Sequence, residues 1–163
     1  MTICVKTCFM VVSYGAYLGL SENYVSKPIF ILQKRAMHLM TFNNLQCPSS
    51  PLFSEFHILK AFDLVKSLNI FFIHNFLNNK LPSYLLNSFA FNKVDHTHDT
   101  RVARMGLLSI PTSNTITFGI KSFSTIAISQ WNEFQRLNPE NDLSLLPFNS
   151  IKKLFINHCL ESY

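Results

Sequence analysis

The chain has 163 residues, of which 48% are hydrophobic and only 14% charged, and its formal net charge is +5. This length suits one domain with its own core and argues against a disulfide-stapled peptide, while a charged fraction below the roughly 25% of ordinary domains predicts a surface that associates with something. The basic residues are scattered from Lys6 to Lys153, so charge alone favours nucleic-acid binding only weakly.

An apolar run over Phe9–Leu20 follows Lys6 near the N-terminus. It imitates a signal peptide, but no A-x-A-type cleavage site follows, and a membrane span needs about 20 apolar residues. We therefore expect a buried helix or strand, poor packing over residues 1–24 and an intracellular protein without a membrane span. A secreted or membrane-inserted product made from residues 1–20 is a third-ranked alternative.

The next predicted element is a helix over Pro28–Phe42, capped by Ser26 with Pro28 in its first turn. Steps of three and four residues predict its core face. That face consists of Ile29, Leu32, Ala36, Leu39 and Met40. Lys34 and His38 are expected on the opposite face, with Arg35 at its margin.

The largest apolar segment, Leu52–Asn78, follows a helix start at Ser50-Pro51. Its predicted buried face is marked by Ile58, Phe62, Val65, Phe72 and Phe76. Its predicted solvent side carries Lys60, Asp63 and Ser67, with Asp63 paired to Lys66 or Ser67 across a turn. The polar sequence Asn78–Pro82 ends the segment.

The second half of the chain predicts shorter elements. We expect a short helix over Pro82–Phe89, an exposed polar loop over Asn92–Ala103 and a small hairpin pairing Gly106–Ile110 with Thr115–Phe118. Ser122 begins a helix whose buried side is Phe123, Ile126, Ala127, Gln130, Trp131 and Phe134. After a loop over Asn138–Pro147, Asn149 caps a last helix with Ile151, Leu154, Phe155, His158 and Cys159 on one side and Lys152 and Lys153 on the other. The predicted fold class is mainly α, one helical domain over residues 1–163 with one short β-hairpin.

Few residue clusters suggest chemistry. The run Asp95-His96-Thr97-His98-Asp99 places two histidines on one side of an extended loop, and Cys4 and Cys8 are one helical turn apart. Neither group has the further ligands that a zinc site needs, and no apolar wall is expected beside the aspartates to raise a pKa for acid–base catalysis. We expect a solvated loop, reduced thiols, and no metal, cofactor or small-molecule substrate. The single histidines His38, His57 and His74 are expected at surface or boundary positions.

Six basic residues are the candidates for contacts with nucleic-acid phosphates. They are Lys34, Arg35, Arg101, Arg104, Lys152 and Lys153. Aromatic neighbours such as Phe30 and Phe42 are candidates for stacking on bases. A scattered, solvated set of charges is the competing interpretation.

Short motifs follow one another in a fixed order from about Val11 onward. They are Tyr14-Gly15, LQKRAMHLM at 32–40, SPLF at 50–53, ILKAFDL at 58–64, NKLP at 79–82, Thr100-Arg101, Gly119–Phe123, Trp131-Asn132 and Phe148–Phe155. This succession resembles the C-terminal region of reverse transcriptases encoded by non-LTR (LINE-type, jockey-like) retrotransposons, downstream of the polymerase palm. The resemblance implies a helical fold comparable to the thumb and post-thumb region.

Departures from the family pattern are also present. Leu18 stands where the family usually has Trp and His38 where it usually has Arg, and the "LP" expected after Trp131-Asn132 is absent. The family's metal-binding F/Y-x-D-D motif does not occur in these 163 residues. Since two-metal phosphoryl transfer needs those carboxylates, the chain is not expected to polymerise nucleotides.

The expected function is a non-catalytic remnant of a retrotransposon reverse transcriptase that once helped to hold RNA or DNA template or primer. Lys34, Arg35 and Arg101 are the principal expected contacts, and Trp131 is expected to be a packing anchor. The alternative is a small helical module that binds a protein partner through an uncovered apolar face and has no nucleic-acid activity.

Overall fold

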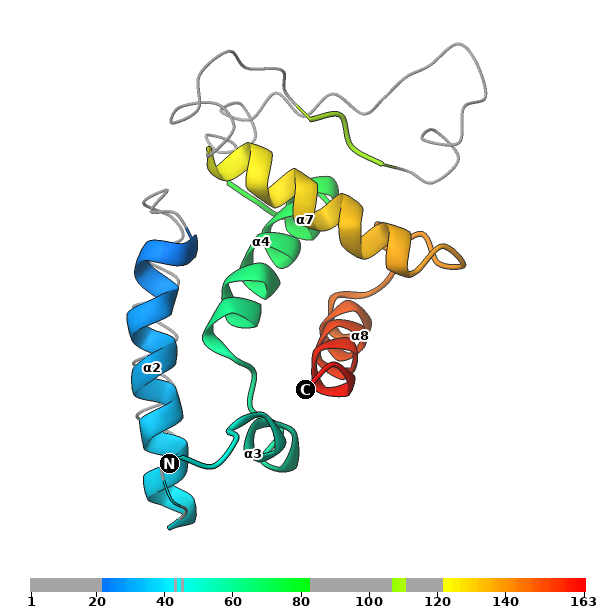
Figure 1. Cartoon of the computed structure of the whole chain (residues 1–163). Helices are drawn as coiled ribbons and strands as arrows, with labels where there is room; N and C mark the ends of the chain where they lie inside the picture. The colour runs from blue at the N-terminus through cyan, green and yellow to red at the C-terminus, as the bar shows by residue number, and fades with distance from the viewer. Residues whose placement is uncertain (1–21, 43, 45, 83–106, 111–121) are drawn as a thin grey trace. The chain divides into compact units, whose positions relative to one another are not determined.

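The computed structural model describes residues 22–42, 44, 46–82, 107–110 and 122–163. These residues form mainly helices, which confirms the predicted fold class. The helices are α2 (Glu22–Thr41), α3 (Ser50–Glu55), α4 (Ala61–Leu77), α7 (Phe123–Leu137) and α8 (Phe148–Glu161) (Figure 1). No strand longer than a single bridge residue, Leu108, occurs in the part of the chain that the structure describes.

The chain divides into two compact units. The first contains the residues up to Ser67 together with Lys152–Tyr163, and the second contains Leu68–Ile151. The division falls inside α4 and near the beginning of α8, so each of these helices supplies residues to both units. The expectation of one domain over residues 1–163 stays a prediction.

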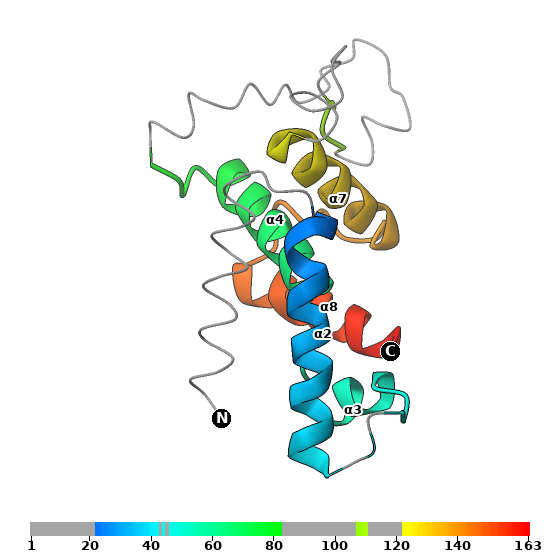
Figure 2. The ribbon, with the colours of Figure 1, turned by 60° about the vertical axis from the view of Figure 1, so that its left-hand side comes forward.

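The core of the first unit lies between α2 and α3. Met37, Leu52 and Phe53 are buried, and Phe30, Ile58 and Tyr163 pack against them. The rings of Phe30 and Phe53 stack with centroids 6.0 Å apart. Figure 2 shows α3 beside the C-terminal half of α2. Burial of these aromatic and aliphatic side chains is the principal force that holds the two helices together.

The buried side of α2 differs from the predicted one. Leu32 and Leu39 are 63% and 73% exposed, whereas Met37 and His38 are only 2% and 4% exposed. The expectation that His38 faces solvent beside Lys34 was therefore wrong. Apolar residues occur on nearly every side of this helix, so their spacing did not define which side is buried; contacts with α3 decide it.

The start of α2 also differs from the prediction. The helix begins at Glu22, so Pro28 lies inside it rather than in its first turn. Proline has no N–H to donate and therefore removes one helical hydrogen bond. Because α2 begins at Glu22, Ser26 also lies inside the helix, and the expected N-cap at Ser26 is wrong.

The long apolar segment is interrupted between α3 and α4. His57 has a φ of 50°, a left-handed conformation that ends α3, and α4 begins only at Ala61. Gln33 of α2 holds the connection, because its Nε2 donates to the Leu59 carbonyl at 2.8 Å and its Oε1 accepts from the Ala61 N–H at 3.0 Å. We call this arrangement, in which one side-chain carboxamide accepts from one backbone N–H and donates to one backbone carbonyl, an amide clamp.

The predicted solvent side of α4 is partly wrong. Ser67 is 3% exposed, and Asp63 accepts a 2.6 Å hydrogen bond from the Tyr163 hydroxyl at the end of the chain rather than pairing across a turn. The predicted buried positions Val65 and Phe72 are buried, and the helix ends at Leu77 as expected.

The core of the second unit is formed by α4 and α7. Its largest fully buried side chains include Ile70 and Ile73 from α4, Ile128 and Trp131 from α7, and Leu143 from the following loop. Trp131 is 1% exposed, as expected for a packing anchor. The two helices contact each other directly, because the rings of Phe72 and Phe123 meet edge to face with centroids 5.0 Å apart and the Asn69 Nδ2 donates to the Gln130 Oε1 at 2.8 Å.

Two further amide clamps attach loops to α7. Asn132 accepts from the Leu108 N–H at 2.9 Å and donates to the Leu108 carbonyl at 2.8 Å. Gln135 donates to the Asn141 carbonyl at 2.7 Å and accepts from the Leu143 N–H at 3.2 Å. Because the buried backbone groups of these loops need partners, the clamps replace the pairing that a sheet would give.

The predicted N-cap is correct for α7 and wrong for α8. Ser122 is the N-cap of α7, and its side chain accepts from the Thr125 N–H, as expected. Helix α8 begins at Phe148, so Asn149 lies inside it and is not its cap. On α8, Ile151, Phe155 and Cys159 are buried as predicted, but His158 is exposed.

Several predictions fall on residues that the structure does not describe. They are the N-terminal run with Cys4 and Cys8, almost all of the short helix over Pro82–Phe89, the polar loop with Asp95–Asp99, and the hairpin partner Thr115–Phe118.

Candidate nucleic-acid interface

Two of the predicted phosphate-contacting residues, Lys34 and Arg35, lie exposed on α2. The Lys34 Nζ stands over the Phe30 ring, 4.6 Å from its centroid, and this cation–π contact orients the ammonium group beside the helix. The helix around them is cationic, since no Asp or Glu occurs between Glu22 and Glu55. This segment therefore offers positive charge without a neighbouring carboxylate in sequence.

Lys152 and Lys153 lie exposed on α8, as the sequence predicted. Both belong to the first unit, as do Lys34 and Arg35. Arg101 and Arg104 lie outside the described residues. The structure thus assigns the four described candidates to one unit.

Charge is distributed unequally between the two units. The first unit contains eight lysine and arginine residues against four aspartate and glutamate residues, and the second contains six against five. Sequence inspection alone suggested a scattered charge, because the α8 lysines are far from α2 along the chain. Because Lys152 and Lys153 belong to the first unit, the excess of basic over acidic residues lies in that unit.

The aromatic candidates differ in accessibility. Phe30 is half-buried, and its ring contacts Phe53 and Phe62, the latter at a centroid distance of 5.2 Å. Phe42 is 97% exposed and follows the last residue of α2 with a φ of 55°. Of these two rings, Phe42 is the one accessible to a base or another partner.

Sequence reasoning missed a cluster around the last residue, Tyr163. Its hydroxyl donates to Asp63 and accepts from the Lys60 N–H at 2.9 Å, while the Lys60 Nζ stands 3.8 Å from the centroid of its ring. Burial, and then the hydrogen bond to Asp63, raise the pKa of the Tyr163 hydroxyl, which stays protonated as a donor. Lys60 is therefore engaged inside the unit, and the four exposed residues are better placed to meet a ligand.

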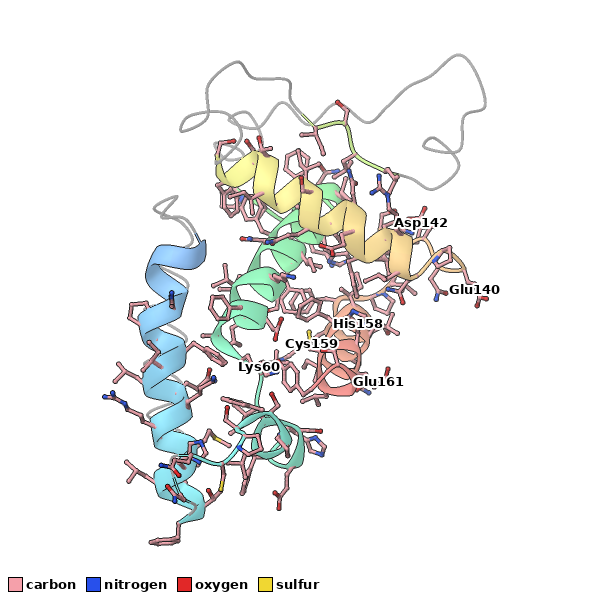
Figure 3. All side chains as sticks on the ribbon, in the orientation of Figure 1. Lys60, Glu140, Asp142, His158, Cys159 and Glu161 are labelled. Carbon is pink, nitrogen blue, oxygen red and sulfur yellow. The ribbon has the colours of Figure 1, made fainter. Side chains whose placement is uncertain are left out.

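The neighbouring thiol, Cys159, is 5% exposed. Burial, followed by the negative charge of Asp63, raises its pKa to about 12, so it is not a nucleophile at neutral pH. Figure 3 shows Lys60 before α4 and Cys159 on α8. The other described cysteine, Cys47, is exposed and free.

In the second unit, His74 is 1% exposed, and its Nε2 lies 3.0 Å from the Leu146 carbonyl. Its ring stacks on Trp131 with centroids 6.4 Å apart. Burial lowers the pKa of His74, and the nearby positive charge of Lys80 acts in the same direction, against the contact with Leu146. His74 is therefore a neutral core residue and not the boundary residue expected.

Within the described ranges, no group of three or more His, Cys, Asp or Glu side chains is arranged to hold a metal ion. None of the helices in this part of the chain is long and apolar enough to cross a membrane. Comparison of the sequence with models of protein families, and of the chain with curated proteins and with solved structures, finds no match.

Proposed function

We propose that this chain is a non-catalytic remnant of a retrotransposon-encoded reverse transcriptase whose first unit binds the phosphate backbone of RNA or DNA. The resemblance of the ordered motifs supports the origin. The observation that supports binding is that Lys34, Arg35, Lys152 and Lys153 are all exposed in the unit with the larger basic excess. Arginine and lysine at such positions contact phosphate without reading sequence.

The proposal includes an absence of polymerase activity and an intracellular location. The chain lacks the paired aspartates that hold two metal ions in the family. A primer-extension assay with Mg²⁺ is expected to give no product above a protein-free control, and any processive extension would contradict this part of the proposal.

Binding is tested with a fluorescently labelled single-stranded RNA, measured by anisotropy over a range of salt concentrations. Each phosphate contact on a single strand contributes about −0.7 to the slope of log K against log salt. Replacing Lys34 and Arg35 together by Ala, or Lys152 and Lys153 together, is expected to weaken binding and to reduce that slope by about 1.4.

The matched control replaces Lys80 and Arg136, two exposed cations of the second unit, by Ala. It removes the same net charge and is expected to change the slope much less. No RNA affinity at low salt, or an equal loss in the control, would reject nucleic-acid binding and leave only the proposed ancestry.

A second candidate function, a module that binds a protein partner, is favoured by the exposed apolar residues of α2. Among the large exposed hydrophobic residues, five belong to this helix or follow it directly: Ile31, Leu32, Leu39, Met40 and Phe42. Such a concentration on one element is typical of an interaction surface.

A further inference from the structure

The core of the second unit contains polar atoms whose hydrogen-bonding capacity is unused. Asn69, His74 and Trp131 are 3%, 1% and 1% exposed, and all three belong to this unit. The Asn69 Oδ1, the His74 Nδ1 and the Trp131 Nε1 are buried and have no hydrogen-bond partner among the described residues. Since nearly all buried polar groups in folded proteins are paired, each of these atoms requires a further partner.

The existing contacts of His74 define the roles of the two ring nitrogens. Its Nε2 lies 3.0 Å from the Leu146 carbonyl, which can only accept, so this nitrogen carries the hydrogen of the neutral imidazole. Burial lowers the pKa of His74 and keeps the ring neutral, which leaves the Nδ1 as an acceptor. The indole Nε1 of Trp131 can only donate. An unpaired acceptor and an unpaired donor therefore belong to two neighbouring rings.

The spacing of the two rings suits one small bridging molecule. Their planes are inclined by 29° and their centroids are 6.4 Å apart, and the Phe148 ring lies with its centroid 6.0 Å from that of His74. Rings in contact have centroids roughly 4.5–7 Å apart, so both separations are in the upper part of that range. Two atoms that are bridged by one water lie at most about 6 Å apart, which is comparable to the separation of the rings.

The pairing of a donor with an acceptor defines the chemistry of the ligand. An anion could accept from the Trp131 Nε1 but would be repelled by the lone pair of the His74 Nδ1. A metal cation could bind that lone pair but would be repelled by the indole N–H, and the described ranges contain no group of three or more metal-binding side chains. A water molecule both accepts and donates, and buried waters typically bind such otherwise unpaired polar groups.

We propose that a buried water molecule lies between α4 and α7, where it accepts a hydrogen bond from the Trp131 Nε1 and donates one to the His74 Nδ1. The water completes a chain of hydrogen bonds from α7 through His74 to the Leu146 carbonyl in the loop before α8. Asn69 lies five residues before His74, more than one helical turn away, and is not part of this site. The inference is independent of RNA binding and of the proposed ancestry.

The single tryptophan makes the test direct, because the indole N–H of Trp131 gives one signal in a proton–nitrogen NMR spectrum of the full chain. Cross-peaks between the indole proton and water are measured by NOESY and ROESY at neutral pH. A long-lived buried water gives cross-peaks of opposite sign in the two experiments, whereas exchange with bulk water gives the same sign. Opposite signs are expected. Cross-peaks of the same sign, or none, would overturn the proposal.

The imidazole gives a second measurement on the unaltered chain. A long-range proton–nitrogen spectrum distinguishes the two neutral forms of His74, and the hydrogen is expected on the Nε2. A hydrogen on the Nδ1 would overturn the proposal, because that nitrogen could not accept from water.

A variant tests the location. His74→Phe keeps an aromatic ring but removes the acceptor, and it is expected to abolish the opposite-sign cross-peaks of the indole proton. The matched control His158→Phe, at an exposed position, is expected to retain them. Circular dichroism verifies that the helices remain. Unchanged cross-peaks in a folded His74→Phe variant would overturn the proposal, and if this variant does not fold, the two measurements on the unaltered chain decide.

A different partner for Trp131 is also distinguished. If a group outside the described residues accepts from the Trp131 Nε1, the indole proton gives cross-peaks to protein protons and none to water, and the proposal fails. That result would leave the RNA-binding proposal unaffected, because the exposed basic residues that carry it belong to the first unit.

Discussion

Gln33 lies in the sequence LQKRAMHLM at 32–40, and in the structure it is a structural residue. Its carboxamide joins α2 to the backbone on both sides of Lys60. The two basic residues that follow it in sequence are exposed. One three-residue segment thus combines a packing contact with two residues available to a ligand.

Gln33→Glu is expected to destabilise the first unit. The carboxylate still accepts from the Ala61 N–H but has no hydrogen to donate to the Leu59 carbonyl, which is left without its partner at a cost of about 1–3 kcal/mol. Urea denaturation followed by circular dichroism measures the change. Gln46→Glu, at an exposed position, makes the same charge change without a clamp, and an equal effect there would contradict the role of Gln33.

Phe42→Gly is expected to raise stability, because glycine adopts the left-handed conformation after a helix without steric cost. The expected gain is about 0.5–1 kcal/mol, reduced by the greater freedom of glycine in the unfolded chain. Thermal unfolding gives the measurement. A fall in the melting temperature would contradict this prediction.

At the scale of elements, α7 shows what the sequence could predict. Ser122 marks its start, and Ala127, Gln130, Trp131 and Phe134 were correctly predicted to be buried. The spacing did not predict the burial of Asn132 and Gln135, whose side-chain amides bind the neighbouring loops. The exposure of Lys152 and Lys153 followed from the same reasoning on α8.

Helix α2 shows why the rest could not be predicted. Between Ile29 and Met40 apolar residues face nearly every direction, so periodicity did not select Met37 over Leu39. Which side of α2 is buried depends on its contacts with Phe53 and with the segment around Leu59, and both are distant from α2 in sequence. The interruption at His57 was missed because neither glycine nor proline marks it. Clamps such as that of Asn132 have no local sequence pattern.

His74 makes the contact between α4 and the loop before α8 dependent on pH. Because burial lowers its pKa below the usual 6.5, the unfolded chain binds the proton more readily. Neutral His74 contributes to the free energy of unfolding, and this contribution is fully present above about pH 6.5. It is lost as the pH falls through the lower pKa that His74 has in the folded state. Urea midpoints measured between pH 7.5 and 5 are expected to fall.

The histidine variants isolate this effect. His74→Gln is expected to flatten the dependence on pH in this range, whereas His158→Gln, at an exposed position, is expected to retain it. If both variants keep the slope of the parent chain, another group is responsible.

For the whole molecule, two helices contain residues of both compact units. Unfolding one unit would therefore leave α4 and α8 truncated, and short helical remnants are unstable in water. We expect one cooperative transition. Trp131, the single tryptophan, reports on the second unit by fluorescence, while far-ultraviolet circular dichroism reports on all helices. Coincident curves would agree with a single domain, and separated midpoints would contradict it.

The modification rate of the buried Cys159 thiol can report how often the end of α8 opens. Since this side chain is enclosed beside Tyr163 and its pKa is raised to about 12, a maleimide or disulfide reagent can modify it only while the end of α8 is detached. The modification rate, followed by mass spectrometry under native conditions with exposed Cys47 as the fast internal reference, therefore counts openings of that end.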